Sequence, residues 1–218
     1  MNVLELFAGS RSIGKNAEKL GHKVFSVDWD NYEGINLSVD IETLTTDAIP
    51  FIPDMVWASP DCTTYTIAAI STHRNGTEPK SEYAKKCDNV NKHFIELIKK
   101  WQTVNNEMVF FIENPRGMLR KMPFMQEFKR YTIWYCQYGD DRAKPTDIWT
   151  NSKTWKPRNI CHNGNKKCHH QPAPRGSKTG TQGRKGSFDR SKIPDELCIE
   201  ILKTLETKAT QNQDCLSV

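Results

Sequence analysis

Short, nearly continuous apolar runs recur along the first 150 residues and alternate with helical patterns. Such runs are typical of central parallel strands that are covered on both faces. Residues 12–21 and 83–101 have the spacing of amphipathic helices, and Gly21 stands where the first of them should end. This alternation predicts an α/β fold with a doubly wound, Rossmann-like, mostly parallel sheet. The apolar runs lie at residues 3–7, 23–27, 54–58, 108–112, 132–136 and 147–150.

Two stretches interrupt the alternation. Residues 66–82 show no clear period and contain glycine and proline, so we expect a long loop, which in a compact domain is usually functional or disordered. Residues 151–190 form a second irregular stretch, rich in glycine, proline, lysine and histidine. Residues 194–207 then show an amphipathic pattern with Pro194 near its start, which predicts a closing helix.

The composition is that of an ordinary globular protein. With 218 residues, of which 37% are hydrophobic, the chain can form one α/β domain with a buried core and a small appendage. No run approaches the ~20 apolar residues of a membrane helix. Because the sequence begins directly on a predicted strand, we expect an intracellular, cytoplasmic protein. The seven cysteines, scattered from Cys62 to Cys215, do not have the pattern of a disulfide framework.

Charge is distributed unevenly along the chain. Residues 1–150 carry 18 Lys and Arg against 20 Asp and Glu. Residues 151–192 carry 11 Lys and Arg and one acid, Asp189, which gives a net charge of +10. A basic block attached to a near-neutral body indicates contact with phosphates, and a solvated basic loop is the alternative.

Chemically useful side chains follow four successive predicted strands. A glycine turn follows the first strand, a carboxylate and a tryptophan the second, a cysteine the third and another carboxylate the fourth. The segments are Phe7-Ala8-Gly9-Ser10, Asp28-Trp29-Asp30, Ser59-Pro60-Asp61-Cys62 and Glu113-Asn114-Pro115. Ligands of an open parallel sheet bind beyond the carboxyl ends of its strands, so we expect these segments to form one site.

The first two strand ends suit a nucleoside cofactor. Gly9 permits a tight turn and close approach of a ligand to the backbone. Asp28 could bind two ribose hydroxyls, and Trp29 could stack on an adenine. Asp40 and Ile41, after a short loop, could bracket the same adenine. The alternatives are an ordinary turn at Gly9, a helix cap at Asp28 and simple packing at Trp29.

The other two strand ends suit nucleophilic catalysis. Cys62 has polar neighbours, whereas an intracellular cysteine is more often buried and inert. A nucleophilic thiol needs thiolate character from a nearby cation, for which Arg142 and Lys144 are candidates. A protonated carboxyl group at Glu113 could donate a hydrogen bond to a ring nitrogen and activate the ring. A helix cap is the alternative role of Glu113.

These residues resemble the motifs of the cytosine-C5 DNA methyltransferases, particularly the compact members found in bacteriophages. The resemblance covers roughly residues 1–150 and returns at 188–202. The Pro-Cys motif has one extra residue here, and the arginine motif, which follows a Tyr-Gly pair, is degraded. The matching segments are Phe7-Ala8-Gly9, Asp28-Trp29, Asp40-Ile41, Pro60-Asp61-Cys62, Glu113-Asn114, the Arg142, Lys144 and Thr146 positions after Tyr138-Gly139, and Arg190-Ser191-Lys192-Ile193-Pro194.

The resemblance implies the fold of a class I methyltransferase that uses S-adenosylmethionine. It implies a monomeric protein of a bacterium or phage-infected cell that acts on double-stranded DNA. The target cytosine would be flipped out of the duplex. Cys62 would add to its C6, Glu113 and Arg142 would bind the ring, and C5 would accept the methyl group. The 66–82 loop would close over the cytosine. The implied cofactor residues are Phe7, Ala8, Gly9, Ser10, Asp28, Trp29, Asp40, Ile41, Ser59, Pro60 and Ser191.

Two other functions are open at this point. An RNA cytosine-C5 methyltransferase would use the same fold and would depend on the 2′-hydroxyl of its substrate. A non-catalytic DNA-binding protein with a degenerate cofactor site is favoured slightly by the first loop, where Ser10-Arg11-Ser12 replace the usual second glycine. The intact Cys62 and Glu113 argue against that function.

Residues 161–183 combine basic side chains with metal-ligand types. Cys161, Cys168, His169 and His170 do not have a standard zinc spacing, so we expect no metal and favour a DNA-contacting element. The candidate nucleic-acid contacts are Lys166, Lys167, Arg175, Lys178, Arg184 and Lys185.

The sequence therefore predicts three parts. Residues 1–150 form the catalytic domain that binds S-adenosylmethionine, and residues 151–190 form a short target-recognition segment. Residues 191–210 form a helix that returns to the catalytic domain.

Overall fold

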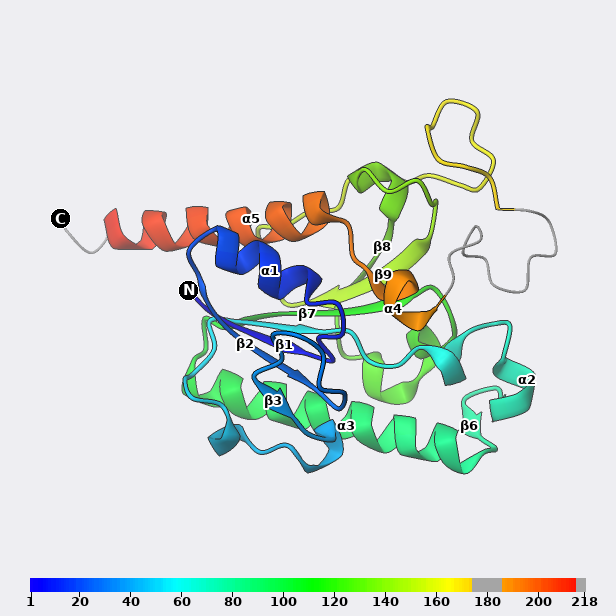
Figure 1. The fold of residues 1–218 in the computed structure, drawn as a ribbon, viewed down its shortest axis with the longest axis horizontal. Helices are drawn as coiled ribbons and strands as arrows, with labels where there is room; N and C mark the ends of the chain where they lie inside the picture. The colour runs from blue at the N-terminus through cyan, green and yellow to red at the C-terminus, as the bar shows by residue number, and fades with distance from the viewer. Residues whose placement is uncertain (174–185, 215–218) are drawn as a thin grey trace.

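A seven-stranded sheet forms the centre of the molecule (Figure 1). The computed structural model describes residues 1–173 and 186–214. The strand order is β3-β2-β1-β4-β7-β9-β8; the first five strands are parallel, and β9 is antiparallel to both of its neighbours. The strands are β1 (Asn2–Leu6), β2 (Lys23–Asp28), β3 (Leu37–Ser38), β4 (Met55–Ala58), β7 (Val109–Pro115), β8 (Arg130–Trp134) and β9 (Pro145–Thr150).

The predicted fold class, a doubly wound and mostly parallel α/β sheet, is confirmed. All six predicted strands are present close to their expected positions, and the two-residue strand β3 is an addition. The apolar run of β9 suggested another parallel strand. β9 is antiparallel instead, because the short connection from β8 contains no crossover helix that could return the chain to the other end of the sheet.

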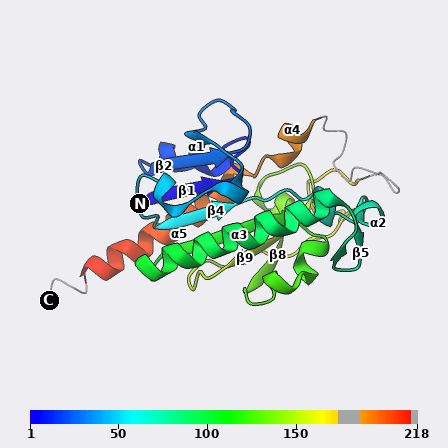
Figure 2. The same ribbon diagram turned by 90° about the horizontal axis from the view of Figure 1, so that it is seen from below.

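Helices cover both faces of the sheet (Figures 1 and 2). The long helix α3 (Glu82–Val104) lies on one face, and α1 (Ser12–Lys19) and α5 (Asp195–Asp214) lie on the other. α1 ends in a Schellman motif, in which the amide of Gly21 bonds to the carbonyl of Glu18 and the amide of His22 to that of Ala17. Gly21 has a φ of 80°, as its predicted role at the helix end requires.

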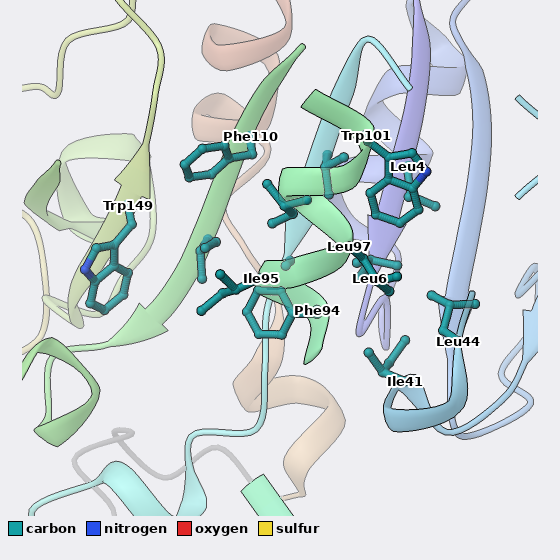
Figure 3. Close-up of a cluster of buried hydrophobic side chains, with 14 of the residues drawn as sticks. Leu4, Leu6, Ile41, Leu44, Phe94, Ile95, Leu97, Trp101, Phe110 and Trp149 are labelled. Atoms are coloured by element: carbon teal, nitrogen blue, oxygen red, sulfur yellow. The ribbon is translucent and has the colours of Figure 1, made fainter. Parts of the chain in front are cut away.

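Alternation of side chains along β1 divides the core into two layers. Leu4 and Leu6 pack with Phe94 and Leu97 of α3 (Figure 3). Val3 points to the opposite face, into the cluster formed with α1 and α5. The sheet is therefore buried on both sides, and its accessible chemistry is confined to the strand ends.

The segments between strands contain more structure than the sequence indicated. Residues 66–82, expected to be an irregular loop, include the short helix α2 (Ile70–His73) and the paired strands β5 (Arg74–Asn75) and β6 (Glu78–Pro79). A second short helix, α4 (Ser187–Ser191), precedes α5. Within residues 1–173 and 186–214, no helix has both the length and the apolar character needed to cross a membrane.

Candidate active site

The turn after β1 is held in an unusual backbone conformation. Phe7, Gly9 and Arg11 have φ angles of 54°, 47° and 56°, which are strained for the two non-glycine residues. The Phe7 ring packs edge-on against Phe94, with centroids 5.4 Å apart. The Arg11 guanidinium donates to Ser26 Oγ at 3.1 Å and also pairs with Glu18. These contacts fix the backbone of the turn before any ligand binds. Elsewhere in the turn, Ala8 is buried and Ser10 Oγ lies 2.9 Å from Ser12 Oγ.

Glu5, which the sequence analysis did not identify, supports this turn. Its side chain is buried in the middle of β1, where it accepts hydrogen bonds from the Ile13 amide at 3.0 Å and Ser26 Oγ at 2.9 Å. A Cβ atom on Gly14 would stand 2.6 Å from Glu5 Oε2, so any other residue at position 14 would displace the Glu5 carboxyl group. Burial raises the pKa of Glu5 to about 7. The signal in the sequence was a single acid inside the apolar run Val3–Phe7.

We expect the protein to lose stability as the pH rises from about 4.5 to about 7, and Glu5→Gln to weaken this dependence. In that window an unfolded glutamate is ionised, whereas the folded Glu5 keeps its proton. The folded state then binds more protons, so this group lowers the free energy of unfolding by up to about 1.4 kcal/mol per pH unit.

Urea unfolding at several pH values measures this slope. Glu82→Gln is the matched control, because the Glu82 side chain is 88% exposed. Equal slopes in the Glu5→Gln variant and the wild type would contradict the prediction.

β2 ends beside the same turn. The Asp28 carboxylate accepts the Gly9 amide at 2.9 Å and the Asp30 amide at 3.0 Å, and burial raises its pKa. Trp29 follows with a side chain that is 73% exposed. A carboxylate and an open aromatic surface are therefore adjacent to the glycine turn.

Asp40 and Ile41 are placed differently from Asp28 and Trp29. Asp40 accepts the Glu42 amide at 3.1 Å and pairs with Lys86 at 2.6 Å, and this pairing lowers its pKa. Ile41 is buried in the α3 layer of the core (Figure 3). Only Asp40 of this pair presents an accessible functional group.

A buried network holds the turn that carries Cys62. The Arg74 side chain is fully buried and pairs with Asp88 at 2.6 Å. Its guanidinium also donates to the Thr64 carbonyl at 2.9 Å and lies 4.2 Å from the centroid of the Tyr65 ring. Because a buried ion pair with these additional contacts has few alternative arrangements, the network fixes the backbone directly after Cys62.

The surroundings of Cys62 keep it as a thiol in the free protein. The side chain is partly buried, and burial raises its pKa to about 11. The nearby carboxylates of Asp61 and Glu113 add to this rise, whereas the charge of Lys144 opposes it. Of the two cations considered from sequence, Lys144 is thus the one whose charge acts on the thiol.

The end of β7 brings Glu113 next to the Cys62 turn. Glu113 is buried, and its Oε1 accepts a hydrogen bond from the Tyr135 hydroxyl at 2.8 Å. The next residue, Asn114, donates to the carbonyl of the buried Pro60 at 2.8 Å. This bond ties β7 to the segment that leads into Cys62, so the predicted thiol and carboxyl group lie in one site. Ser59, at the start of that segment, accepts from the Trp57 indole at 2.8 Å.

The turn between β8 and β9 presents two cations in different roles. Arg142 is buried, and its Nε donates to Asp140 Oδ1 at 2.8 Å. Lys144 has a strained φ of 25°; its Nζ donates to the Arg190 carbonyl at 3.1 Å and lies 4.5 Å from the Tyr135 ring centroid. Arg142 is therefore held in an ion pair, and Lys144 is the cation beside Cys62 and Glu113.

The chain returns to the glycine turn after α4. Ser191 Oγ lies 3.8 Å from the position that a Cβ on Gly9 would occupy. The Ile193 amide donates to Ser12 Oγ at 3.1 Å, and Asn16 donates to Asp195 at 2.7 Å. Ser191 thus lies beside the glycine turn.

The candidate nucleic-acid contacts are only partly described. Lys166 and Lys167 are exposed. Arg175, Lys178, Arg184 and Lys185 lie outside the described residues.

Solved structures with a similar fold include methyltransferases. A protein from E. coli described as a DNA modification methyltransferase encoded within a prophage superposes with a TM-score of 0.50, at 15% identity over 75% of this chain and 52% of its own. The chain shares its fold with this protein. The methyltransferase EhMeth of Entamoeba histolytica gives a TM-score of 0.55, at 14% identity over 73% of this chain and 56% of its own. The chain therefore spans about half the length of these structures. No family model and no curated protein matches the sequence.

Proposed function

We propose that the protein transfers a methyl group from S-adenosylmethionine to C5 of a cytosine in DNA, through a covalent adduct of Cys62. The observation that carries this proposal is the convergence of a thiol, a buried carboxyl group and a lysine at the carboxyl end of the sheet. Cys62, Glu113 and Lys144 influence one another electrostatically there. The two solved structures that share the fold are themselves described as methyltransferases.

The neighbouring strand ends fit the cofactor. Each Asp28 oxygen accepts one backbone amide and has a further lone pair for a ribose hydroxyl. The exposed Trp29 indole offers an apolar face for adenine. Gly9 lets a ligand approach the backbone, and Ser191 closes the other side of the turn. When bound, S-adenosylmethionine supplies an electrophilic methyl group on a sulfonium sulfur.

Cys62 and Glu113 have different roles toward the cytosine ring: Cys62 is the nucleophile, and Glu113 is the proton donor. Two negative charges in one desolvated site oppose each other, so ionisation of the Cys62 thiol is favoured when Glu113 is protonated. In that state the thiolate can add to C6 while Glu113 donates its proton to the ring nitrogen N3. Electron density then rises at C5, the position that is methylated. A water molecule then takes the proton from C5, the bond between C6 and the Cys62 sulfur breaks, Cys62 leaves as a thiolate, and the N3 proton returns to Glu113, which restores the ring.

Positive charge in the site assists this reaction. Lys144 lowers the free energy of the Cys62 thiolate and would hold the carbonyl oxygen of the flipped cytosine. Arg142, the residue first assigned that role, pairs with Asp140 and donates to the Arg190 carbonyl, so we propose Lys144 for the role in its place.

DNA is the proposed substrate because of the basic segment 151–192, with its net charge of +10. We propose residues 1–150 as the catalytic domain, 151–190 as a short target-recognition segment and 191–210 as the returning helix. The exposed Lys166 and Lys167 would contact phosphates. The solved E. coli structure is described as a DNA modification enzyme, which agrees with this substrate.

Incubation with S-adenosylmethionine that carries a labelled methyl group tests the proposal. We expect label in duplex DNA, recovered as 5-methylcytosine after nuclease digestion, and none in an RNA duplex of the same sequence. Label in RNA alone would mean that the substrate is RNA and not DNA. Cofactor-dependent DNA binding without transfer, on DNA of many sequences, would indicate a non-catalytic protein.

A further inference from the structure

Three thiols and an imidazole meet outside the candidate active site. Cys136, Cys161, Cys168 and His170 place their ligand atoms within 4.8 Å of one another. A tetrahedral zinc ion with Zn–S bonds of ~2.3 Å would set its sulfur ligands roughly 3.8 Å apart. The cluster therefore needs only a small contraction to coordinate a metal ion.

Burial distinguishes this cluster from a chance group of surface residues. Cys136, Cys161 and His170 are buried, and Cys168 is partly buried. His170 Nδ1 lies 3.9 Å from Cys161 Sγ, and within residues 1–173 and 186–214 its Nε2 has no hydrogen-bond partner. Either nitrogen of a neutral imidazole can bind zinc. A buried imidazole nitrogen without a partner is costly, and a ring flip that turns Nε2 toward the thiols and a bound metal ion would remove that cost.

Amide groups surround the thiols in the way that thiolate ligands require. The Asn165 side chain donates to Cys161 Sγ at 3.5 Å. The Gln137 side chain lies 3.7 Å from the Sγ atoms of both Cys136 and Cys168. Such N–H donors stabilise negative charge on metal-bound sulfur.

The segment that holds these ligands has only a small apolar interior. Its backbone makes two successive turns, closed by bonds from the Asn165 amide to the His162 carbonyl and from the Cys168 amide to the Asn165 carbonyl. These turns bring Cys161 and Cys168 together. Most of residues 158–173 is exposed, including Ile160 at 79%. Among the described residues, the apolar cluster beneath it contains only Cys136, Ala143 and Cys161, with Trp134 and Cys168 packed against it. Small elements of this kind commonly need a metal or a disulfide.

We propose that Cys136, Cys161, Cys168 and His170 bind one structural zinc ion. Three sulfurs and one nitrogen in tetrahedral reach favour zinc over magnesium or calcium, and four protein ligands leave no open position for chemistry. This set differs from the one considered from sequence. Cys136, in the turn that follows β8, takes the place of His169, whose exposed ring bonds to the Asp140 carbonyl at 3.0 Å.

A zinc ion at this site would connect residues 161–171 of the basic segment to the turn between β8 and β9. Cys136 belongs to the turn that leads to Arg142, and the Gln171 amide bonds to the Asp141 carbonyl at 2.9 Å. An isolated bridge also pairs Arg142 with Gln171. Zinc would therefore hold residues 161–171 against the turn that carries Arg142 and Lys144. This role is independent of the proposed reaction.

Metal analysis of the full chain tests the proposal. The protein is made without an affinity tag that binds metal, in cells grown with added zinc, and its metals are measured by mass spectrometry. We expect about one zinc per chain and almost none in Cys136→Ser and Cys161→Ser. Two matched controls should keep their zinc: Cys62→Ser, which removes a thiol elsewhere, and His169→Asn, which removes the neighbouring imidazole.

A second measurement covers the case in which the ligand variants do not fold. Cobalt replaces zinc in the wild-type chain, and three thiolate ligands should give a sulfur-to-cobalt charge-transfer band with the intense visible bands of tetrahedral cobalt. Wild-type protein that holds no zinc and takes up no cobalt would overturn the proposal, as would a disulfide among these cysteines or iron in place of zinc. Zinc lost in His169→Asn but kept in Cys136→Ser would refute the ligand set.

Discussion

Replacing Cys62 by serine should abolish methyl transfer, with a loss of roughly 10⁴-fold or more, the order expected when an enzyme loses its nucleophile. A serine hydroxyl is far harder to ionise than a thiol, and no described histidine stands beside Cys62 as a base to activate it. Initial rates of label incorporation into DNA measure the loss. Because Cys62 is partly buried at the start of a turn and contributes little to the core, cofactor binding and thermal unfolding should change little.

A covalent trap gives the control for this experiment. Fluorine at C5 of the target cytosine cannot leave as a proton, so the adduct with Cys62 should persist after methyl transfer. Intact-mass measurement should find this adduct with the wild type and not with Cys62→Ser. Turnover by the serine variant, or an adduct on another residue, would remove Cys62 from the mechanism.

Glu113→Gln should lower turnover by ~10²- to 10⁴-fold, the usual range for loss of a general acid. Glutamine keeps the shape of the side chain but cannot transfer a proton to N3. The same change removes a carboxylate that raises the pKa of Cys62, so alkylation of the free thiol should move to lower pH. Methyl transfer and alkylation by iodoacetamide, each followed against pH, measure the two effects.

Asp61→Asn separates these two effects. Asp61 also raises the pKa of Cys62, but it bonds to the Thr63 amide and the Tyr83 hydroxyl and has no assigned role as an acid. We expect it to move alkylation in the same direction as Glu113→Gln while retaining most of the methyl transfer. If the Glu113→Gln and Asp61→Asn variants transfer the methyl group at equal rates, Glu113 acts only through its charge and not as a general acid.

The sequence was most informative where local pattern decides structure. Continuous apolar runs located six strands of the sheet, and residue types at the strand ends indicated Cys62, Asp28 and Glu113 as candidate site residues. The direction of β9 did not follow from its composition, because a buried antiparallel strand between two neighbours is as apolar as a parallel one.

Roles that depend on tertiary contacts were the ones the sequence left open. Arg142 and Lys144 are close in sequence, and only the fold shows that Asp140 pairs with the first while the second faces Cys62. Cys136 could not be grouped with Cys161 by spacing, because β9 and a long loop separate them along the chain. Glu5 was missed because the acid was read as part of a strand rather than as the partner of Ser26 and Ile13.

The layer formed by α1 and α5 constrains how this chain folds during synthesis. The bond between Ile193 and Ser12 joins residues 181 positions apart. Until α5 has left the ribosome, this apolar face of the nascent sheet, which includes Val3 and Trp57, is covered only by the short helix α1. During the same period the glycine turn is not yet closed by Ser191. Strand β1 therefore waits for α5, and a chaperone that shields the exposed sheet should associate with the nascent protein until α5 emerges.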